Sequence, residues 1–151
     1  MISKRVLILL AASAVMTTAV PQSFKPETQL KLRKAAYSMM GYSFGSLAQM
    51  AEGKRPYSKD DAIRYADLLV QVSTVPRLFF GEGTDKGETR AKPEIWTNRK
   101  DFDAKMDNMV NEVAKLPQVA RTGDLEALKV AVKKADDSCD ACHTDYRVKQ
   151  R

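Results

Sequence analysis

Both cysteines and the only histidine of the 151-residue chain lie within five residues near its C-terminus, Cys139-Asp140-Ala141-Cys142-His143. The spacing C-x-x-C-H is that of c-type haem attachment. Two thiols one helical turn apart can add to the two vinyl groups of one porphyrin, and the adjacent histidine can bind the iron from below. The motif therefore predicts one haem c, attached through Cys139 and Cys142, with His143 as the proximal iron ligand.

Three other uses of the cysteines fit the sequence less well. A structural zinc site needs four ligands, and Cys139, Cys142 and His143 supply three. A thioredoxin-like redox pair accompanies a βαβ pattern, whereas this pair ends a helical chain. A disulfide between residues three apart would close a very small loop and would stabilise the fold little.

The elements that must position this motif are helices. Four segments have apolar residues at helical spacing, and none indicates a strand convincingly. The first segment ends at Gly53, the second starts at the capping residue Ser58, and the third starts between Thr97 and Asp101. Amphipathic helices with short connections predict an all-α fold, an antiparallel up-down-up-down four-helix bundle over residues 20–151.

Prolines and one long loop divide the predicted helices. Pro76 and Pro117 are each expected to kink or end a helix, because proline lacks the N–H that a helix interior needs. Residues 81–93, GEGTDKGETRAKP, form the longest predicted loop. Loops of this length often serve function in small domains.

The C-x-x-C-H motif ends the apolar stripe of the last predicted helix. That stripe consists of Leu125, Leu128, Val132, Ala135, Cys139, Cys142, His143 and Tyr146. Residues three and four apart share a helix face, so both thiols and the imidazole are expected to point into the bundle core. Arg33 interrupts the apolar stripe of the first helix. A buried charge needs a partner, which a haem propionate or an Asp or Glu on a neighbouring helix would supply.

The N-terminal segment has the pattern of a secretion signal. Lys4 and Arg5 precede an apolar run of about ten residues, and small residues up to Ala19 offer a cleavage site. Because the run is shorter than the roughly 20 residues that span a bilayer, a cleaved signal peptide over residues 1–19 is favoured over a membrane anchor. The expected location is the periplasm, with no membrane contact after cleavage.

The charge distribution argues against a nucleic-acid partner. The net charge of +6 falls to +4 when the signal segment is removed, since that segment contains two cations and no acids. The remaining Lys and Arg residues are scattered among acidic residues, without the basic stripe or arm of a nucleic-acid-binding protein.

The chain resembles cytochrome c′, the family of class II c-type cytochromes, over essentially all of residues 25–151. The matching pieces are KPETQLKLRKAAYSMMGYSFGSL, TRAKPEIW and CDACHTDYR. The larger class of small soluble cytochromes c carries C-x-x-C-H near the N-terminus, whereas only eight residues follow His143 here. The resemblance implies a four-helix bundle that serves single-electron transfer, binding of nitric oxide and carbon monoxide, or both.

The resemblance also implies roles for residues outside the motif. Arg33 and Lys34 stand where the first helix of the family contacts the haem. Thr89 and Arg90 match its haem-edge loop, although Arg90 replaces an acidic residue that is common there. Arg147 matches a basic position beside the proximal ligand; otherwise it would be an arginine favoured at a helix C-terminus by the helix dipole.

The sixth coordination position of the iron decides the function. The chain has no second histidine, so bis-histidine ligation within it is excluded. The resemblance places Tyr37 at the distal position, and Phe80 is a candidate second wall. This predicts a five-coordinate high-spin iron open to diatomic gases. The alternative is a low-spin carrier of electrons in which Met40, one turn further along the first helix, binds the iron.

Partners and oligomeric state follow from the same patterns. We find no constellation of catalytic acid, base or nucleophile and do not expect an enzyme; a small redox protein is the expected partner.

A second stripe on the first helix is formed by Leu32, Ala36, Met39, Ser43, Leu47 and Met50. A helix apolar on two sides has two surfaces to bury, and the family resemblance points the same way, to a homodimer packed through the first two helices. A purely structural bundle with an accidental motif is the remaining alternative, which haem attachment would exclude.

Overall fold

The computed structural model describes residues 24–149, and within them it contains helices and no strand. Four long helices make up most of this part: α1 (Pro26–Ala51), α2 (Lys59–Ser73), α4 (Arg99–Val113) and α6 (Leu125–Tyr146). The predicted signal peptide, residues 1–19, lies outside the described residues. None of the described helices is both long and apolar enough to cross a bilayer.

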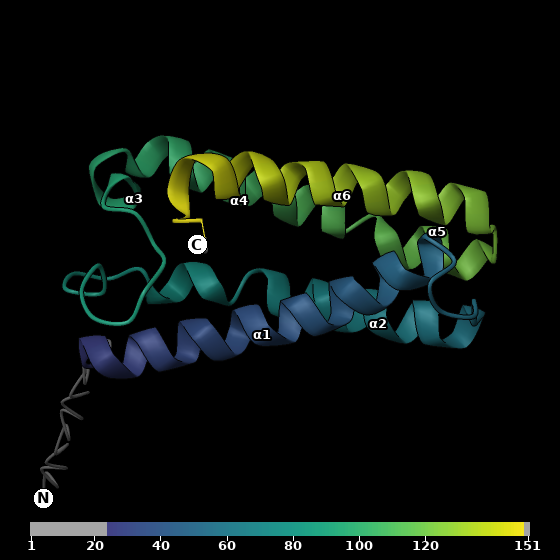
Figure 1. Cartoon of the computed structure of the whole chain (residues 1–151), viewed down its shortest axis with the longest axis horizontal. Helices are drawn as coiled ribbons and strands as arrows, with labels where there is room; N and C mark the ends of the chain where they lie inside the picture. The colour runs from purple at the N-terminus through teal and green to yellow at the C-terminus, as the bar shows by residue number, and fades with distance from the viewer. Residues whose placement is uncertain (1–23, 150–151) are drawn as a thin grey trace, which may run out of the picture.

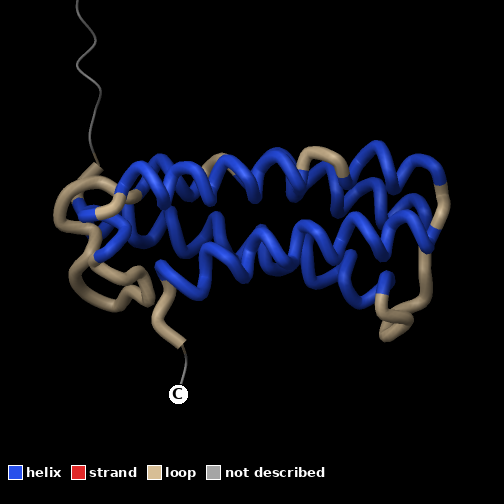
Figure 2. The backbone as a smooth tube through the Cα atoms, turned by 90° about the horizontal axis from the view of Figure 1, so that it is seen from above, coloured by secondary structure: helices blue, strands red, loops and turns tan. Residues whose placement is uncertain are grey.

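The long helices run up, down, up and down, as predicted. Figure 1 shows α1 and α2 side by side and antiparallel in one layer, with α4 and α6 in the second layer. Seen from above, the helices run along the same long axis, and the longer loops lie at the two ends of the bundle (Figure 2). α1 begins and α6 ends at the same end of the bundle, which brings the C-x-x-C-H motif opposite α1.

Three short helical segments complete the part of the chain that the structure describes: η1 (Pro76–Phe79), α3 (Glu94–Thr97) and α5 (Leu116–Thr122). Pro76 opens η1 rather than interrupting α2. The third helix does break ahead of Pro117, as predicted: α4 ends at Val113, and Pro117 lies in the first turn of α5. Proline has no N–H to donate to the carbonyl of Val113, four residues earlier, and its ring would clash with that carbonyl. A first turn tolerates proline since its N–H groups have no partner within the helix.

Local side-chain bonds fix the helix starts. The hydroxyl of Ser58 accepts a hydrogen bond from the backbone N–H of Asp61 at 3.3 Å, which confirms the predicted cap of α2. The Asp124 carboxylate accepts from the N–H groups of residues 126 and 127 at the start of α6. Gly123 precedes it with φ of +77°, a left-handed conformation that ends α5 and that glycine adopts without steric cost.

The second apolar stripe predicted on α1 is mostly internal. Ala36, Ser43, Leu47 and Met50 are buried in the bundle, and only Leu32 and Met39 are exposed. The stripe therefore does not form one outward face, since the bundle covers most of it. The apolar side chains that α1 exposes away from the bundle core are Leu32, Met39 and Tyr42.

Candidate haem site

A cavity of about 830 Å³ lies between α1 and the C-terminal half of α6. Its volume is in the range of small-molecule and cofactor sites, and its walls are mainly apolar and aromatic. All nine predicted site residues line it: Arg33, Lys34, Tyr37, Thr89, Arg90, Cys139, Cys142, His143 and Arg147. Met40 and Phe80, the two further candidates for the distal side, also line the cavity.

The two thiols of the motif are free and half-buried at the cavity wall. Burial raises the pKa of Cys139 to about 11, with Asp136 adding to the shift, and burial likewise raises the pKa of Cys142 to about 11. A dithiol redox pair needs a lowered thiol pKa, because the thiolate is the reactive form. The raised pKa values of Cys139 and Cys142 therefore argue against a redox-active dithiol pair.

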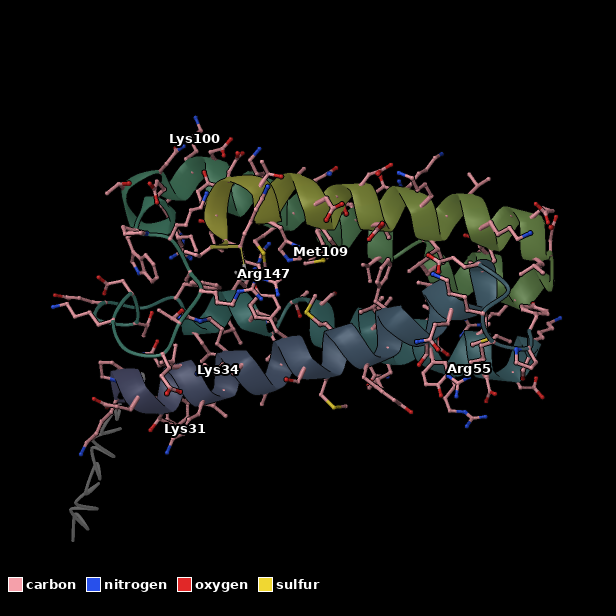
Figure 3. All side chains as sticks on the ribbon, in the orientation of Figure 1. Lys31, Lys34, Arg55, Lys100, Met109 and Arg147 are labelled. Carbon is pink, nitrogen blue, oxygen red and sulfur yellow. The ribbon has the colours of Figure 1, made fainter. Side chains whose placement is uncertain are left out.

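The imidazole of His143 lies at the edge of the cavity, beside a cation. Its side chain is 44% exposed, so it is less enclosed than the sequence pattern predicted. The guanidinium of Arg147 lies 3.4 Å from Nδ1 of His143. Burial, followed by the charge of Arg147, lowers the pKa of His143, so the ring is neutral at pH 7, the form that binds metals. Figure 3 shows Arg147 and Met109 directed into the space between the two helix layers.

Arg33 is 3% exposed and uses four of its five N–H groups on the protein itself. Its Nη1 donates to the carbonyl oxygen of Phe79 at 3.1 Å and to Oγ1 of Thr84 at 3.2 Å. Its Nη2 donates to the carbonyl oxygen of Thr84 at 2.8 Å and to Oγ1 of Thr89 at 3.0 Å. The guanidinium also stacks on the Phe80 ring at 4.3 Å.

The alternative that an Asp or Glu on a neighbouring helix pairs with Arg33 is therefore wrong among residues 24–149. The neutral oxygens of Phe79, Thr84 and Thr89 accept the hydrogen bonds of the Arg33 guanidinium instead. Burial lowers the pKa of Arg33. Arg33 thus connects α1 to the segment that follows η1, whether or not it also faces a haem propionate.

The same loop is tied to the end of α6. Thr89 Oγ1 accepts from the N–H of Ala91 at 3.1 Å, and Ala91 forms an isolated antiparallel bridge with Arg147. Next to this bridge, Nε of Arg90 donates to the carbonyl oxygen of Val148 at 2.9 Å. Lys34 lies at the cavity mouth and pairs with Glu88 at 3.6 Å, where both side chains are mostly exposed. The predicted loop residues are thus close to the motif, and part of their polar capacity serves the loop itself.

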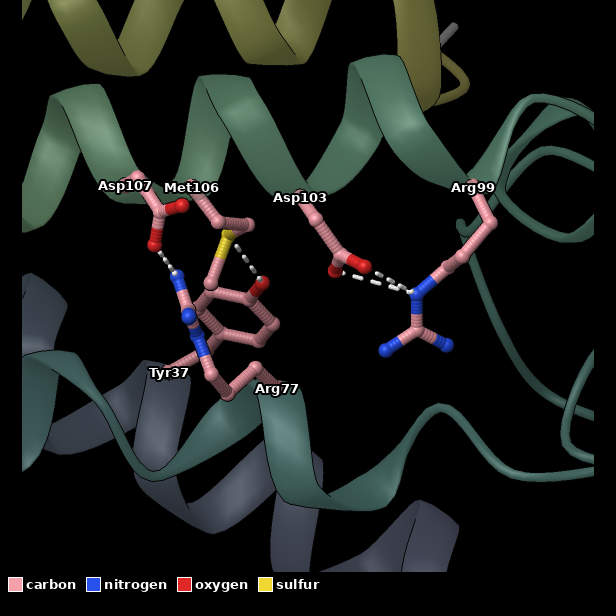
Figure 4. Close-up of polar contacts among 6 residues, drawn as sticks. All are labelled: Tyr37, Arg77, Arg99, Asp103, Met106 and Asp107. Atoms are coloured by element: carbon pink, nitrogen blue, oxygen red, sulfur yellow. Dashed lines mark hydrogen bonds and ion pairs between the residues drawn. The ribbon is translucent and has the colours of Figure 1, made fainter.

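Tyr37 projects from α1 toward α4 (Figure 4). Its hydroxyl oxygen lies 3.9 Å from Sδ of Met106, which accepts the hydrogen bond. Tyr37 as a whole is 36% exposed, and its pKa is raised chiefly by desolvation of the phenol and next by the nearby Cys142. The phenol therefore stays protonated and remains a hydrogen-bond donor.

Sequence reasoning missed three residues of the site. Thr84, 1% exposed, holds Arg33. Met106 holds the Tyr37 hydroxyl, and Asp101 accepts a 2.6 Å bond from Tyr146, one turn after the motif. Met106 is one of the buried residues of α4, and its sulfur contact has no signature in sequence. Thr84 lies in a loop, where no periodicity marks burial.

The residues present fit a haem. Two free thiols and a neutral imidazole stand at one wall of an apolar cavity large enough for a cofactor. Cationic side chains at its mouth, Lys34, Arg90 and Arg147, suit carboxylate groups at the edge of a bound macrocycle. Fold and site together define a four-helix-bundle protein with a c-type haem site.

Comparisons with known proteins agree with that class. A family model described as Cytochrome C' matches residues 28–147. Cytochrome c' of Rubrivivax gelatinosus is 35% identical over 126 residues, which cover 83% of this chain and 98% of that protein. The chain therefore belongs to the cytochrome c′ family, a family of c-type haem proteins of electron transfer.

Solved structures give the same result. Cytochrome c prime from Shewanella frigidimarina aligns with a TM-score of 0.81 at 32% identity, covering 84% of this chain and all of that one. A nitric oxide complex of a point mutant of cytochrome c prime from Alcaligenes xylosoxidans aligns with a TM-score of 0.78 at 33% identity, covering 85% of this chain and all of that one.

Proposed function

We propose that this chain is a periplasmic protein that carries one haem c, bound covalently through Cys139 and Cys142 and ligated by His143. Its iron is five-coordinate and high-spin, binds nitric oxide and carbon monoxide, and also passes single electrons to a small redox protein. The haem supplies the redox couple and the gas-binding iron. The protein residues bind the haem and screen its distal side, and no catalytic acid or base is required.

The observation that carries the proposal is the place of Tyr37. It borders the cavity from α1, across from the helix that bears Cys139, Cys142 and His143. An aromatic ring in that place is a steric screen on the distal side. Its phenol is protonated, as the raised pKa indicates, so it is a poor ligand for the iron.

The proximal side supports the proposal as well. Burial, and next the charge of Arg147 at 3.4 Å from Nδ1, lowers the pKa of His143 and favours the neutral imidazole. The tie between the loop and the end of α6 fixes the turn that carries His143. The nitric oxide complex of a point mutant of the related protein from Alcaligenes xylosoxidans supports gas binding here.

Met40 carries the alternative. It also lines the cavity from α1, and its thioether would give a six-coordinate, low-spin iron that serves electron transfer alone. Substitution separates the two functions. In the proposed protein Met40→Leu leaves the spectrum of the haem unchanged, whereas in the alternative it abolishes the low-spin spectrum.

The test of gas binding is an absorption titration of the purified ferrous protein with nitric oxide and with carbon monoxide. We expect both gases to bind, and Tyr37→Ala to accelerate binding by about tenfold or more because it removes the screen. Tyr42→Ala is the matched control, since Tyr42 lies on the same helix, is 59% exposed and faces away from the cavity. A wild-type protein that fails to bind nitric oxide, or fails to bind carbon monoxide, would overturn the proposal.

A further inference from the structure

We propose that Met106 is a specificity-determining residue for the gas-binding site, because its sulfur holds the hydroxyl of Tyr37 away from a bound ligand. The inference rests on the proposed function and extends it to the choice among diatomic gases. With the hydroxyl held, the distal wall presents ring carbon to the ligand and offers it no hydrogen bond.

The contact that carries the inference joins two helices. Tyr37 comes from α1 and Met106 from α4, and the hydroxyl oxygen and Sδ are 3.9 Å apart (Figure 4). Met106 is 2% exposed, so neighbouring side chains fix the position of its sulfur. Sδ is the one acceptor recorded for the Tyr37 hydroxyl among residues 24–149.

Arg33 does not offer the Tyr37 hydroxyl another acceptor. Arg33, one turn earlier on α1, is a pure donor, and four of its N–H groups are already bonded to the loop. A thioether is a weak acceptor, so the hydroxyl is held loosely compared with a bond to a carboxylate. The contact can therefore be removed by a single substitution without unfolding the core.

Polarity, hydrogen-bond donors and steric access on the distal side together decide how a haem protein binds a diatomic gas. Dioxygen gains negative charge when it binds ferrous iron and is stabilised by a donor, whereas carbon monoxide gains little and depends mainly on steric access. A held hydroxyl therefore favours carbon monoxide and nitric oxide over dioxygen. A released hydroxyl would shift that balance.

The test uses Met106→Leu, which keeps the apolar volume and removes the acceptor. In the carbon monoxide complex, the infrared C–O stretching band is expected to move to lower frequency in Met106→Leu, because the freed Tyr37 hydroxyl donates to the ligand. The affinity for dioxygen relative to carbon monoxide should rise by up to about tenfold, the scale of one net hydrogen bond. Met109→Leu is the control, since Met109 is also buried on α4 and lines the same cavity.

The double variant of Tyr37→Phe with Met106→Leu identifies the cause. If the hydroxyl is responsible, the double variant returns the C–O band to the position of Tyr37→Phe alone. A second readout is independent of the ligand: in methyl NMR, the Met106 resonance should shift on Tyr37→Phe and the Met109 resonance should not.

Three results would be decisive against the inference. An unshifted band in Met106→Leu, or an equal shift in the double variant, would overturn it while leaving the proposed function intact. An unchanged Met106 methyl resonance in Tyr37→Phe would do the same. A wild-type protein that forms no carbon monoxide complex would overturn the proposed function, and the inference with it.

Discussion

The hydroxyl of Tyr146 donates a 2.6 Å hydrogen bond to Oδ2 of Asp101, which joins the last turn of α6 to the first turn of α4. Tyr146 is 4% exposed, and its ring packs edge-on against Phe102 at 5.3 Å. Lys105 approaches Asp101 at 3.8 Å from the same helix. Because His143 lies one turn before Tyr146, this bond fixes the helix end that presents the proximal imidazole.

Removing the Tyr146 hydroxyl should weaken the fold without disturbing its packing. We expect Tyr146→Phe to lower the free energy of unfolding by about 1–3 kcal/mol, the scale of a hydrogen bond to a charged group. Urea denaturation followed by circular dichroism measures this. Tyr42→Phe is the control, because the Tyr42 hydroxyl makes only an exposed 3.4 Å hydrogen bond with the hydroxyl of Tyr65. Equal effects of the two substitutions would contradict a special role for Tyr146.

The same bond makes stability depend on alkaline pH. Burial, followed by the bond to Asp101, raises the pKa of Tyr146 to about 12, while an unfolded tyrosine titrates near 10. A raised phenol pKa means that the neutral form is favoured in the folded state. Its contribution is therefore complete below about pH 10 and is lost as the pH rises through about 12. The difference in stability between wild type and Tyr146→Phe should shrink over that interval; a constant difference up to pH 12 would refute the assignment.

Arg33 and Lys34, adjacent on α1, allow a matched test of how much the hydrogen bonds from Arg33 to the loop stabilise the fold. Arg33→Ala should cost about 1–3 kcal/mol and raise hydrogen exchange around Thr84 and Thr89, since buried acceptors lose their donors. Lys34→Ala should cost less than about 1 kcal/mol, because the Lys34–Glu88 pair is exposed. Arg33→Lys should fail to restore the wild-type value, because an ammonium cannot make four hydrogen bonds in this fork geometry. Full rescue by lysine would show that charge alone matters.

Covalent attachment has a direct chemical test. The double variant with Cys139→Ser and Cys142→Ser should retain no haem on a denaturing gel, and each single variant should retain one thioether. Because both thiols are free and border the cavity, we expect intact mass spectrometry to give one haem per wild-type chain. Haem retained covalently in the double variant would exclude these cysteines as the attachment points.

A homodimer remains a prediction, now with a smaller candidate surface. The exposed apolar residues Leu32, Met39 and Tyr42 lie on α1, at 36%, 44% and 59% exposure. Met39→Glu should weaken self-association by about tenfold or more, measured by sedimentation. Val130→Glu, at an exposed position on α6, is the control. A wild-type protein that is monomeric at micromolar concentration would contradict the prediction.

Local patterns account for what the sequence predicted. The helical period and the C-x-x-C-H spacing involve residues close together in the sequence. The four helices, the cap at Ser58 and the cavity-lining motif could therefore be predicted. The contacts of Arg33 with Thr84 and of Tyr37 with Met106 join residues 51 and 69 positions apart, and nothing in a single sequence pairs them. The misjudged second stripe has a related cause. Periodicity finds apolar faces but cannot tell which of two faces the bundle covers, as Ala36 illustrates.

The most direct measurement is the EPR spectrum of the purified ferric protein at neutral pH. Iron held by His143 and screened by Tyr37 should give a high-spin, five-coordinate signal in wild type, and Tyr37→Met should convert it to a low-spin signal. A low-spin wild-type spectrum that Met40→Leu abolishes would contradict the account and would make Met40 the sixth ligand of a protein for electron transfer alone.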